Sequence, residues 1–146
     1  MAGPWTTVAA APVALTEVAV TAHDGRIWVA GGLRGDGSAS DEVLVFDPVA
    51  ATWASGPRLP EAVHHAALVS TGDGLVLVGG NLGNGTPTAA VRRLDDGAAG
   101  WTDEVPLPEA SRSPASTWPR HRTGRAAPSS SADGSVASSA ILQRST

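Results

Sequence analysis

A repeat of fixed length runs without a gap from Trp5 to about residue 110, and it constrains the fold more than any other feature. Residues of one type recur at the same spacing: Trp5, Trp53 and Trp101; Pro12, Pro60 and Pro108; Gly31-Gly32 and Gly79-Gly80; Val43 and Val91; Asp47 and Asp95. Five residue types in one register are not a coincidence. We call the interval from Trp5 to Trp53 one period. The chain therefore contains copies of one structural unit, in which each copy packs on its neighbour.

Each period contains four short apolar segments separated by turn residues. The expected strands are residues 18–21, 26–30, 42–46 and 52–54, followed by 66–69, 75–78, 91–94 and a segment at Trp101. Gly and Asp occupy the tight connections, which is typical of hairpin turns. No segment keeps helical periodicity over a window of about 11 residues. The sequence therefore predicts an antiparallel meander of four strands in each period.

The order of these motifs resembles the kelch repeat. The matching pieces are residues 27–32 with 43–48 and Trp53, and residues 75–80 with 91–95 and Trp101. The resemblance implies that each copy is a blade of a β-propeller. It also implies a structural role for the repeated motif residues, which are Gly31, Gly32, Asp47, Trp53, Gly79, Gly80, Asp95 and Trp101. The chain departs from the pattern where Val63 and His64 occupy the place at which the family often has Arg.

The predicted fold is all-β: a partial kelch-type β-propeller of two four-stranded antiparallel blades, followed by a disordered tail. The blades are expected at residues 13–57 and 61–105, inside a folded unit of residues 1–110. A further N-terminal strand is expected over residues 4–12, because Trp5-Thr6-Thr7-Val8 resembles the fourth strand of a blade.

The repeat register is lost after about residue 110. Ala127-Pro128 stands where a third Gly-Gly would be, and residues 111–146 contain ten Ser. Such a segment has too little apolar surface to offset the entropy of ordering it, so we expect disorder. A changed reading frame and an evolved linker both explain the loss. The net charge also changes, from −8 over residues 1–110 to +4 over residues 111–146.

No catalytic, cofactor or metal site is expected. The chain has no Cys and no Tyr, which excludes thiolate chemistry and the copper radical oxidases of kelch-like architecture. His64 and His65 are adjacent on an expected strand, where successive side chains point to opposite faces. The sequence therefore predicts that they do not share a metal ion.

The longest expected connections, residues 33–41 and 81–90, should share one side of the blades with the links 56–62 and 104–110. Loops on a rigid scaffold are where binding usually occurs. The candidate binding residues are Arg34, Asp36, Arg58, His64, Asn81 and Asn84. The predicted function is a non-catalytic scaffold for an unknown protein or small ligand. The alternatives are a fragment of a sugar-acting propeller enzyme whose catalytic residues lie in missing blades, and a product without function.

The net charge of the repeats argues against nucleic acid as a partner. Residues 1–12 lack a charged signal sequence and no long apolar run occurs, so a cytoplasmic, non-membrane location is expected. The absence of Lys and the abundance of Arg, Ala, Gly and Pro indicate a GC-rich bacterial genome. Self-association through uncovered blade faces is also expected, including pairing of residues 5–9 with the last strand of another copy.

Overall fold

A computed structural model describes residues 3–108 of the chain. Two four-stranded antiparallel sheets form its frame. Blade 1 consists of β1 (Ala19–His23), β2 (Arg26–Ala30), β3 (Val43–Asp47) and β4 (Thr52–Ser55). Blade 2 consists of β6 (Ala67–Thr71), β7 (Gly74–Val78), β9 (Val91–Asp95) and β10 (Thr102–Asp103). The short strands β5 (Val63–His64) and β8 (Asn81–Leu82) pair with each other.

The predicted fold class is confirmed, since residues 3–108 contain strands and no helix. Within this range there is accordingly no helix of the length and apolarity needed to cross a membrane. The predicted tail, residues 111–146, lies outside the described residues. The domain division near residue 110 stays a prediction.

The period of the sequence is also a period of the backbone. The first three strands of blade 1 and blade 2 have equal lengths and start exactly one period apart. Loop hydrogen bonds repeat in the same way: the Gly31 amide donates to the Glu42 carbonyl at 2.9 Å, and the Gly79 amide to the Ala90 carbonyl at 2.9 Å. The outermost strands of the two blades differ in length, since β10 is shorter than β4.

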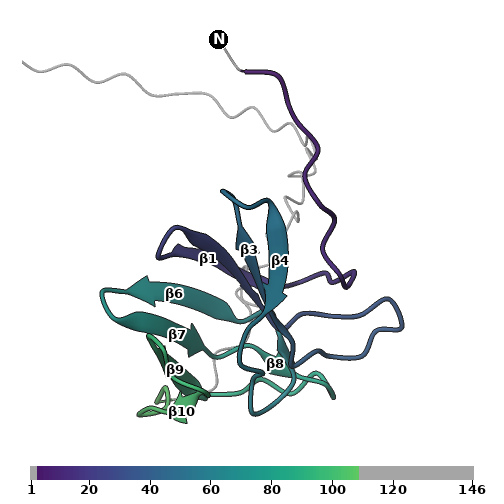
Figure 1. Cartoon of the computed structure of the whole chain (residues 1–146). Coiled ribbons are helices and arrows are strands. Elements are labelled where there is room, and N and C mark those ends of the chain that lie inside the picture. Colours follow the sequence, from purple (N-terminus) through teal and green to yellow (C-terminus); the bar gives the residue numbers. More distant parts are fainter. Residues whose placement is uncertain (1–2, 109–146) are drawn as a thin grey trace, which may run out of the picture.

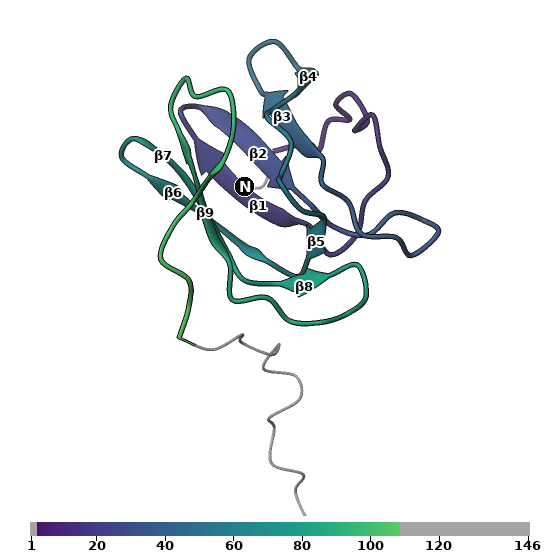
Figure 2. The same cartoon turned by 90° about the horizontal axis from the view of Figure 1, so that it is seen from below.

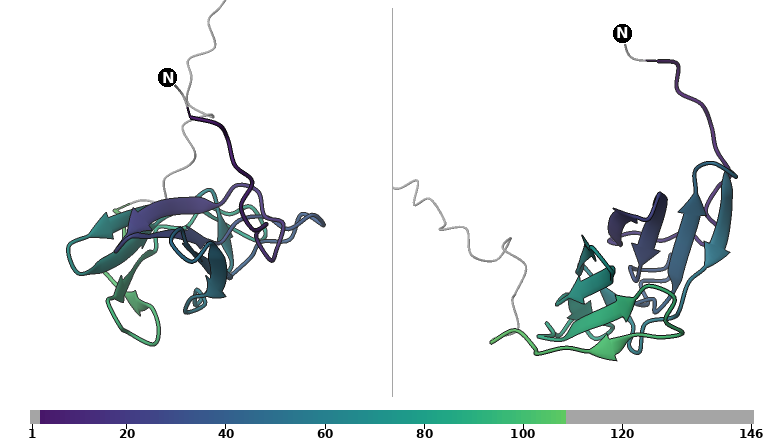
Figure 3. Two further views of the ribbon diagram at one scale, coloured as in Figure 1. Left: turned by 45° about the horizontal axis from the view of Figure 1, so that its top comes forward. Right: turned by 60° about the vertical axis from the view of Figure 1, so that its left-hand side comes forward.

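The two blades form a fan. The first strands, β1 and β6, lie next to each other, while the outer strands β4 and β10 diverge (Figures 1 and 3). The hydrophobic core lies between the blades. Blade 1 contributes Ala19, Ala30 and Val43; blade 2 contributes Leu68, Leu75, Leu77 and Leu94; and the link between them adds Leu59 and Val63.

Each Gly-Gly pair ends the second strand of its blade, as the sequence predicts. Gly32 has a φ of 108°, and a Cβ there would lie 2.6 Å from the Thr16 carbonyl oxygen. Gly80 has a φ of 100°, and a Cβ there would lie 2.7 Å from the His64 carbonyl oxygen. Only glycine combines this conformation with such a close backbone approach. The pairs therefore allow the link that enters each blade to pass against its second strand.

The predicted N-terminal strand over residues 4–12 is wrong. Residues 3–11 form no strand, and the Trp5 side chain is fully exposed. A strand needs a neighbour with free backbone groups, and this segment is instead joined to the outer strand β4 through a side chain. There the Ala9 carbonyl accepts a 2.9 Å hydrogen bond from the Trp53 indole. The Pro57 carbonyl accepts the equivalent bond from Trp101 at 2.8 Å. The segment thus occupies the place of an interblade link.

Candidate binding face

The long loops lie on the side of the fan opposite the β1–β2 and β6–β7 turns (Figure 1). The first loop closes with a bridge between Leu33 and Ala39, and the second with a bridge between Asn81 and Pro87. The loops are neighbours, because a Cβ on Gly83 would lie 3.6 Å from the Ala39 Cβ. We call this side, formed by residues 33–42, 56–65 and 81–90, the loop face.

The interblade link belongs to the same face. The Leu59 amide donates to the Asp41 carbonyl at 2.9 Å, and the Val63 amide to the Ser40 carbonyl at 3.2 Å. His64 lies opposite Asn81 in the β5–β8 pair, which Figure 2 shows beside the loops. The loops and the link therefore come together as the alternation of connections predicts.

Asp36 and Asn84 shape the loops. The Asp36 Oδ1 accepts hydrogen bonds from the Ser38 hydroxyl at 2.7 Å and the Ser38 amide at 2.9 Å. These bonds hold the pKa of Asp36 below its usual value. Asn84, which lies one period later, accepts from the Thr86 amide at 2.9 Å. Both residues close equivalent turns with their own side chains.

Arg34 and Arg58 meet two carboxylates. Arg58 Nη1 donates to both Asp41 oxygens, at 2.7 and 2.9 Å, and its Nη2 lies 3.3 Å from a Glu42 oxygen. Arg34 Nη1 donates to the Ala39 carbonyl at 3.0 Å, and its Nη2 lies 3.7 Å from Glu42. The two cations and two anions form a cluster with no net charge.

This ionic cluster belongs to blade 1 alone. The positions one period later in the chain are uncharged: Leu82, Ala89, Ala90 and Pro106. The cluster is thus not part of the repeated frame, and it gives the loop face its polar character next to blade 1.

His64 and His65 do not point to opposite sides, so the predicted separation of their side chains is wrong. Their ring centroids are 4.8 Å apart and their Nδ1 atoms 2.5 Å apart. The cause is the backbone of His65, whose φ of 55° is left-handed, so the alternation of an extended strand stops at His64. On its other side, His65 Nε2 lies 3.0 Å from a Glu17 oxygen.

A comparison with protein-family models gives a match to the Kelch motif over residues 14–60. The resemblance to the kelch repeat is therefore confirmed over these residues. The match covers blade 1 with its flanking links, and blade 2 repeats the same strand register one period later. No curated protein matches the chain.

The repeated aspartates of the two blades make different contacts. The Asp47 Oδ1 accepts hydrogen bonds from the amides of Val49 and Ala50, at 2.9 and 3.0 Å. These bonds lower the pKa of Asp47 and stabilise the turn before β4. Asp47 Oδ2 also lies 3.6 Å from Arg26 Nε, whereas the Asp95 carboxylate forms an ion pair with Arg93. The family pattern therefore specifies the turn but not the contacts of its carboxylate.

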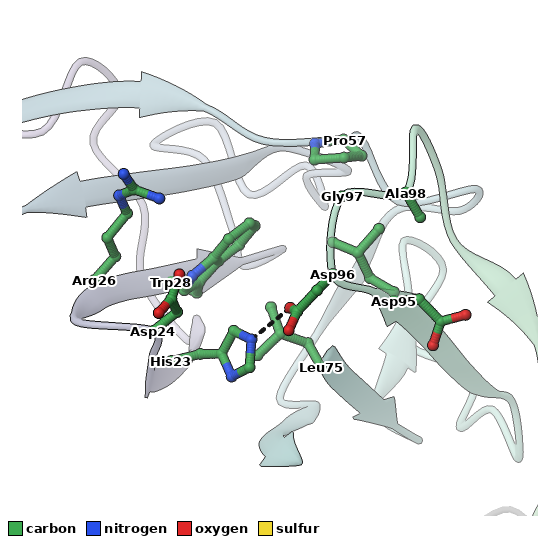
Figure 4. A pocket seen from close by; sticks show the side chains of 11 residues that line it. His23, Asp24, Arg26, Trp28, Pro57, Leu75, Asp95, Asp96, Gly97 and Ala98 are labelled. Atoms are coloured by element: carbon green, nitrogen blue, oxygen red, sulfur yellow. Dashed lines mark hydrogen bonds and ion pairs between the residues drawn. The ribbon is translucent and has the colours of Figure 1, made fainter. Parts of the chain in front are cut away.

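A cleft of about 350 Å³ opens between the two blades on the side opposite the loop face. Arg26 and Trp28 line it from blade 1, and Leu75, Asp95 and Asp96 from blade 2 (Figure 4). Within residues 3–108, neither this cleft nor the loop face contains a cluster of three or more His, Cys, Asp or Glu side chains that could hold a metal ion.

His23 connects the two blades at this cleft. Its Nε2 lies 2.7 Å from an Asp96 oxygen and its Nδ1 lies 2.8 Å from the Ser70 hydroxyl. Because the carboxylate can only accept, we assign the ring proton to Nε2, and Nδ1 accepts from Ser70. The histidine is 9% exposed and its partners come from blade 2. The contacts of these three residues therefore join the two blades.

Sequence reasoning did not single out Glu17, His23, Asp41, Glu42 or Asp96. The sequence does contain a signal for several of them: a charged residue in one repeat stands where the other repeat has a residue of a different type. Asp41 and Glu42, for example, correspond to two alanines in blade 2. Departures from a repeat mark residues that the repeated frame does not require.

Proposed function

We propose that the chain is a non-catalytic scaffold that binds a protein partner through the loop face. Kelch repeats generally mediate protein interactions, and the all-β frame supports a scaffold role. The observation that carries the proposal is the convergence of two rigidly closed loops and the interblade link on one side. Loops held by a rigid frame can present side chains to a partner with little loss of entropy on binding.

Arg58 is the side chain best suited to meet a partner, because it is 62% exposed while its Nη atoms are held by Asp41 and Glu42. A held guanidinium loses less conformational freedom on binding, and its remaining N–H groups can donate to carbonyl or carboxylate oxygens. His64 and Asn81 supply further polar groups beside it. Asp36 and Asn84 contribute by shaping the loops.

Photo-crosslinking from the two sides of the fan tests this proposal. A crosslinking amino acid is placed at Gly35 on the loop face or at Gly72 in the β6–β7 turn, since a side chain at either position meets open space. In lysate of the source cells, we expect a discrete partner from Gly35 and none from Gly72. The Arg58→Ala variant should reduce the yield, and equal yields from both sites would contradict the proposal.

Self-association through blade 1 is part of the same proposal. Val20 and Ile27 lie on one face of blade 1 and are 51% and 38% exposed. Their equivalents in blade 2, Leu68 and Leu75, are covered by blade 1. A second copy that presents its free blade 2 face would cover them in the same way. Light scattering should show association that the paired substitutions Val20→Thr and Ile27→Thr reduce; a monomer at all concentrations would contradict it.

A further inference from the structure

We propose that His64 and His65 form a chelating site for a divalent transition-metal ion of the Cu²⁺, Ni²⁺ or Zn²⁺ class. The expectation that they share no metal rested partly on a separation of the side chains that the fold does not have. Its other ground, the lack of Cys and of a third neighbouring His, means that the pair supplies two ligands. The two Nδ1 atoms face each other at 2.5 Å. At this distance one ring donates an Nδ1 hydrogen to the other. With that hydrogen moved to Nε2 of the donor ring, both Nδ1 lone pairs would face one point, where a metal ion could take its place. The inference goes beyond the proposed function, because a metal would bind without any protein partner.

Glu17 orients one of the two ligands. Its carboxylate can only accept, so the His65 Nε2, 3.0 Å away, carries the hydrogen. The lone pair of neutral His65 is then on Nδ1, the atom that faces His64. A carboxylate behind a metal-binding histidine fixes its tautomer and the orientation of its ring. Glu17 is therefore a positioning residue and not a ligand.

The backbone holds the pair in place. Glu17 and His65 lie one period apart, at equivalent positions of the two repeats, and both have left-handed φ angles, of 51° and 55°. The His65 amide donates to the Glu17 carbonyl at 3.0 Å. Because it occurs at both positions, this conformation belongs to the repeated frame, and in the second repeat it turns the His65 ring toward His64. His64 is anchored from the other side by its pairing with Asn81.

The spacing of the nitrogens suits a metal after a small adjustment. Zn–N bonds are about 2.0–2.1 Å long, which places two neighbouring ligand nitrogens roughly 3 Å apart. The rings therefore need to separate by less than about 1 Å. The His65 side chain is 38% exposed, so little packing opposes a shift of this size. Two imidazoles leave the other coordination positions to water or to a ligand from a partner. Imidazole ligands favour Cu²⁺, Ni²⁺ and Zn²⁺ over Mg²⁺ and Ca²⁺.

Titration of the full chain with Cu²⁺ and with Zn²⁺ tests the site, with Mg²⁺ as the matched negative metal. We expect one equivalent of Cu²⁺ to bind, and its electron paramagnetic resonance spectrum to show coupling to two imidazole nitrogens. His64→Asn and His65→Asn should each weaken binding roughly tenfold or more and leave coupling to one nitrogen. Asn is chosen because it tolerates the left-handed backbone of His65. Circular dichroism verifies that the variants fold.

Two further variants make the result specific. His121→Asn changes a histidine elsewhere in the sequence and should leave affinity and spectrum unchanged. Glu17→Gln should weaken binding about tenfold while coupling to both nitrogens persists, as expected of a positioning residue. Unchanged affinity in both His64→Asn and His65→Asn, or coupling to a single imidazole in the unsubstituted chain, would overturn the proposal. Neither result depends on whether the loop face captures a protein partner.

Discussion

Blades 1 and 2 are copies of one unit, yet equivalent apolar side chains have opposite environments. Val20 and Ile27 of blade 1 are 51% and 38% exposed, whereas Leu68 and Leu75 of blade 2 are 8% and 1% exposed. The local strands and turns are the same. The difference arises because blade 1 covers this face of blade 2, while no described residue packs on the corresponding face of blade 1 to the same extent. Burial in a repeat array therefore depends on which neighbour is present.

A second difference concerns charge. The frame of each blade is held by the same hydrogen bonds, including the indole bonds of Trp53 and Trp101. The ionic cluster around Arg58 and the contact between Glu17 and His65 have no counterpart elsewhere in the described repeats. We infer that the repeated residues maintain the scaffold and that the unrepeated ones give each blade its own surface. Four predictions test this comparison.

The largest effect is expected at the covered face. Leu75→Ala should lower the free energy of unfolding by about 3 kcal/mol, because it removes a fully buried side chain and leaves a cavity. Ile27→Ala, at the equivalent exposed position, should cost about 1 kcal/mol or less. Urea denaturation of both variants measures the difference. Equal losses would show that blade 1 is covered in solution, through the self-association proposed above.

The next effect is expected at the Gly-Gly positions. Gly80→Ala should cost about 2 kcal/mol or more, since the new Cβ adds a collision with the His64 carbonyl oxygen to the strain of a left-handed backbone. Gly85→Ala is the matched control, because Gly85 has a φ of 79° but open space around it. The Gly85→Ala variant should lose only the free energy that a left-handed backbone costs a residue with a Cβ, about 1 kcal/mol. Thermal unfolding of both variants decides whether close approach or backbone conformation dominates.

The indole hydrogen bonds provide a smaller, symmetrical test. Trp53→Phe and Trp101→Phe each remove one donor and should each cost about 1 kcal/mol. Removal of residues 1–9 deletes the acceptor of Trp53 but not that of Trp101. In the truncated chain, therefore, Trp53→Phe should become nearly neutral while Trp101→Phe keeps its effect. If both retain their effects, the N-terminal segment does not replace an interblade link.

The smallest effect is a difference in pH dependence between the two loops. The pKa of Asp36 is lowered in the folded chain, so its stabilisation of the first loop is present above the unfolded value near 3.9 and is lost as pH falls through the folded value. Asn84 does not titrate in the equivalent turn. Between pH 5 and pH 2, the amide resonance of Ser38 should shift with the titration of Asp36, while that of Thr86 should not. Equal shifts would contradict the assigned turn role.

Much of the backbone could be predicted from the sequence because the information is local. Alternating apolar residues, Gly-Asp turns and the Gly-Gly pairs specify strands and their ends through the conformations that those residues allow. The prediction of a strand around Trp5 failed because it used this local information alone. Its residues suit a strand, but a strand also needs a partner, and none is available beside it. The separation predicted for His64 and His65 failed because one left-handed residue interrupts the alternation.

The sequence by itself determined the repeat, its register, the all-β class and the positions at which only glycine fits, since each depends on residues close in the chain or on a fixed spacing. Tertiary structure alone decided the rest. Packing of blade 1 on blade 2 brought His23 to Ser70 and Asp96, placed Glu17 against His65, and buried Leu75 while leaving Ile27 exposed. The contacts of His23 join residues 47 and 73 positions apart in the chain. They depend on how two copies are oriented, which is a property that no single copy encodes.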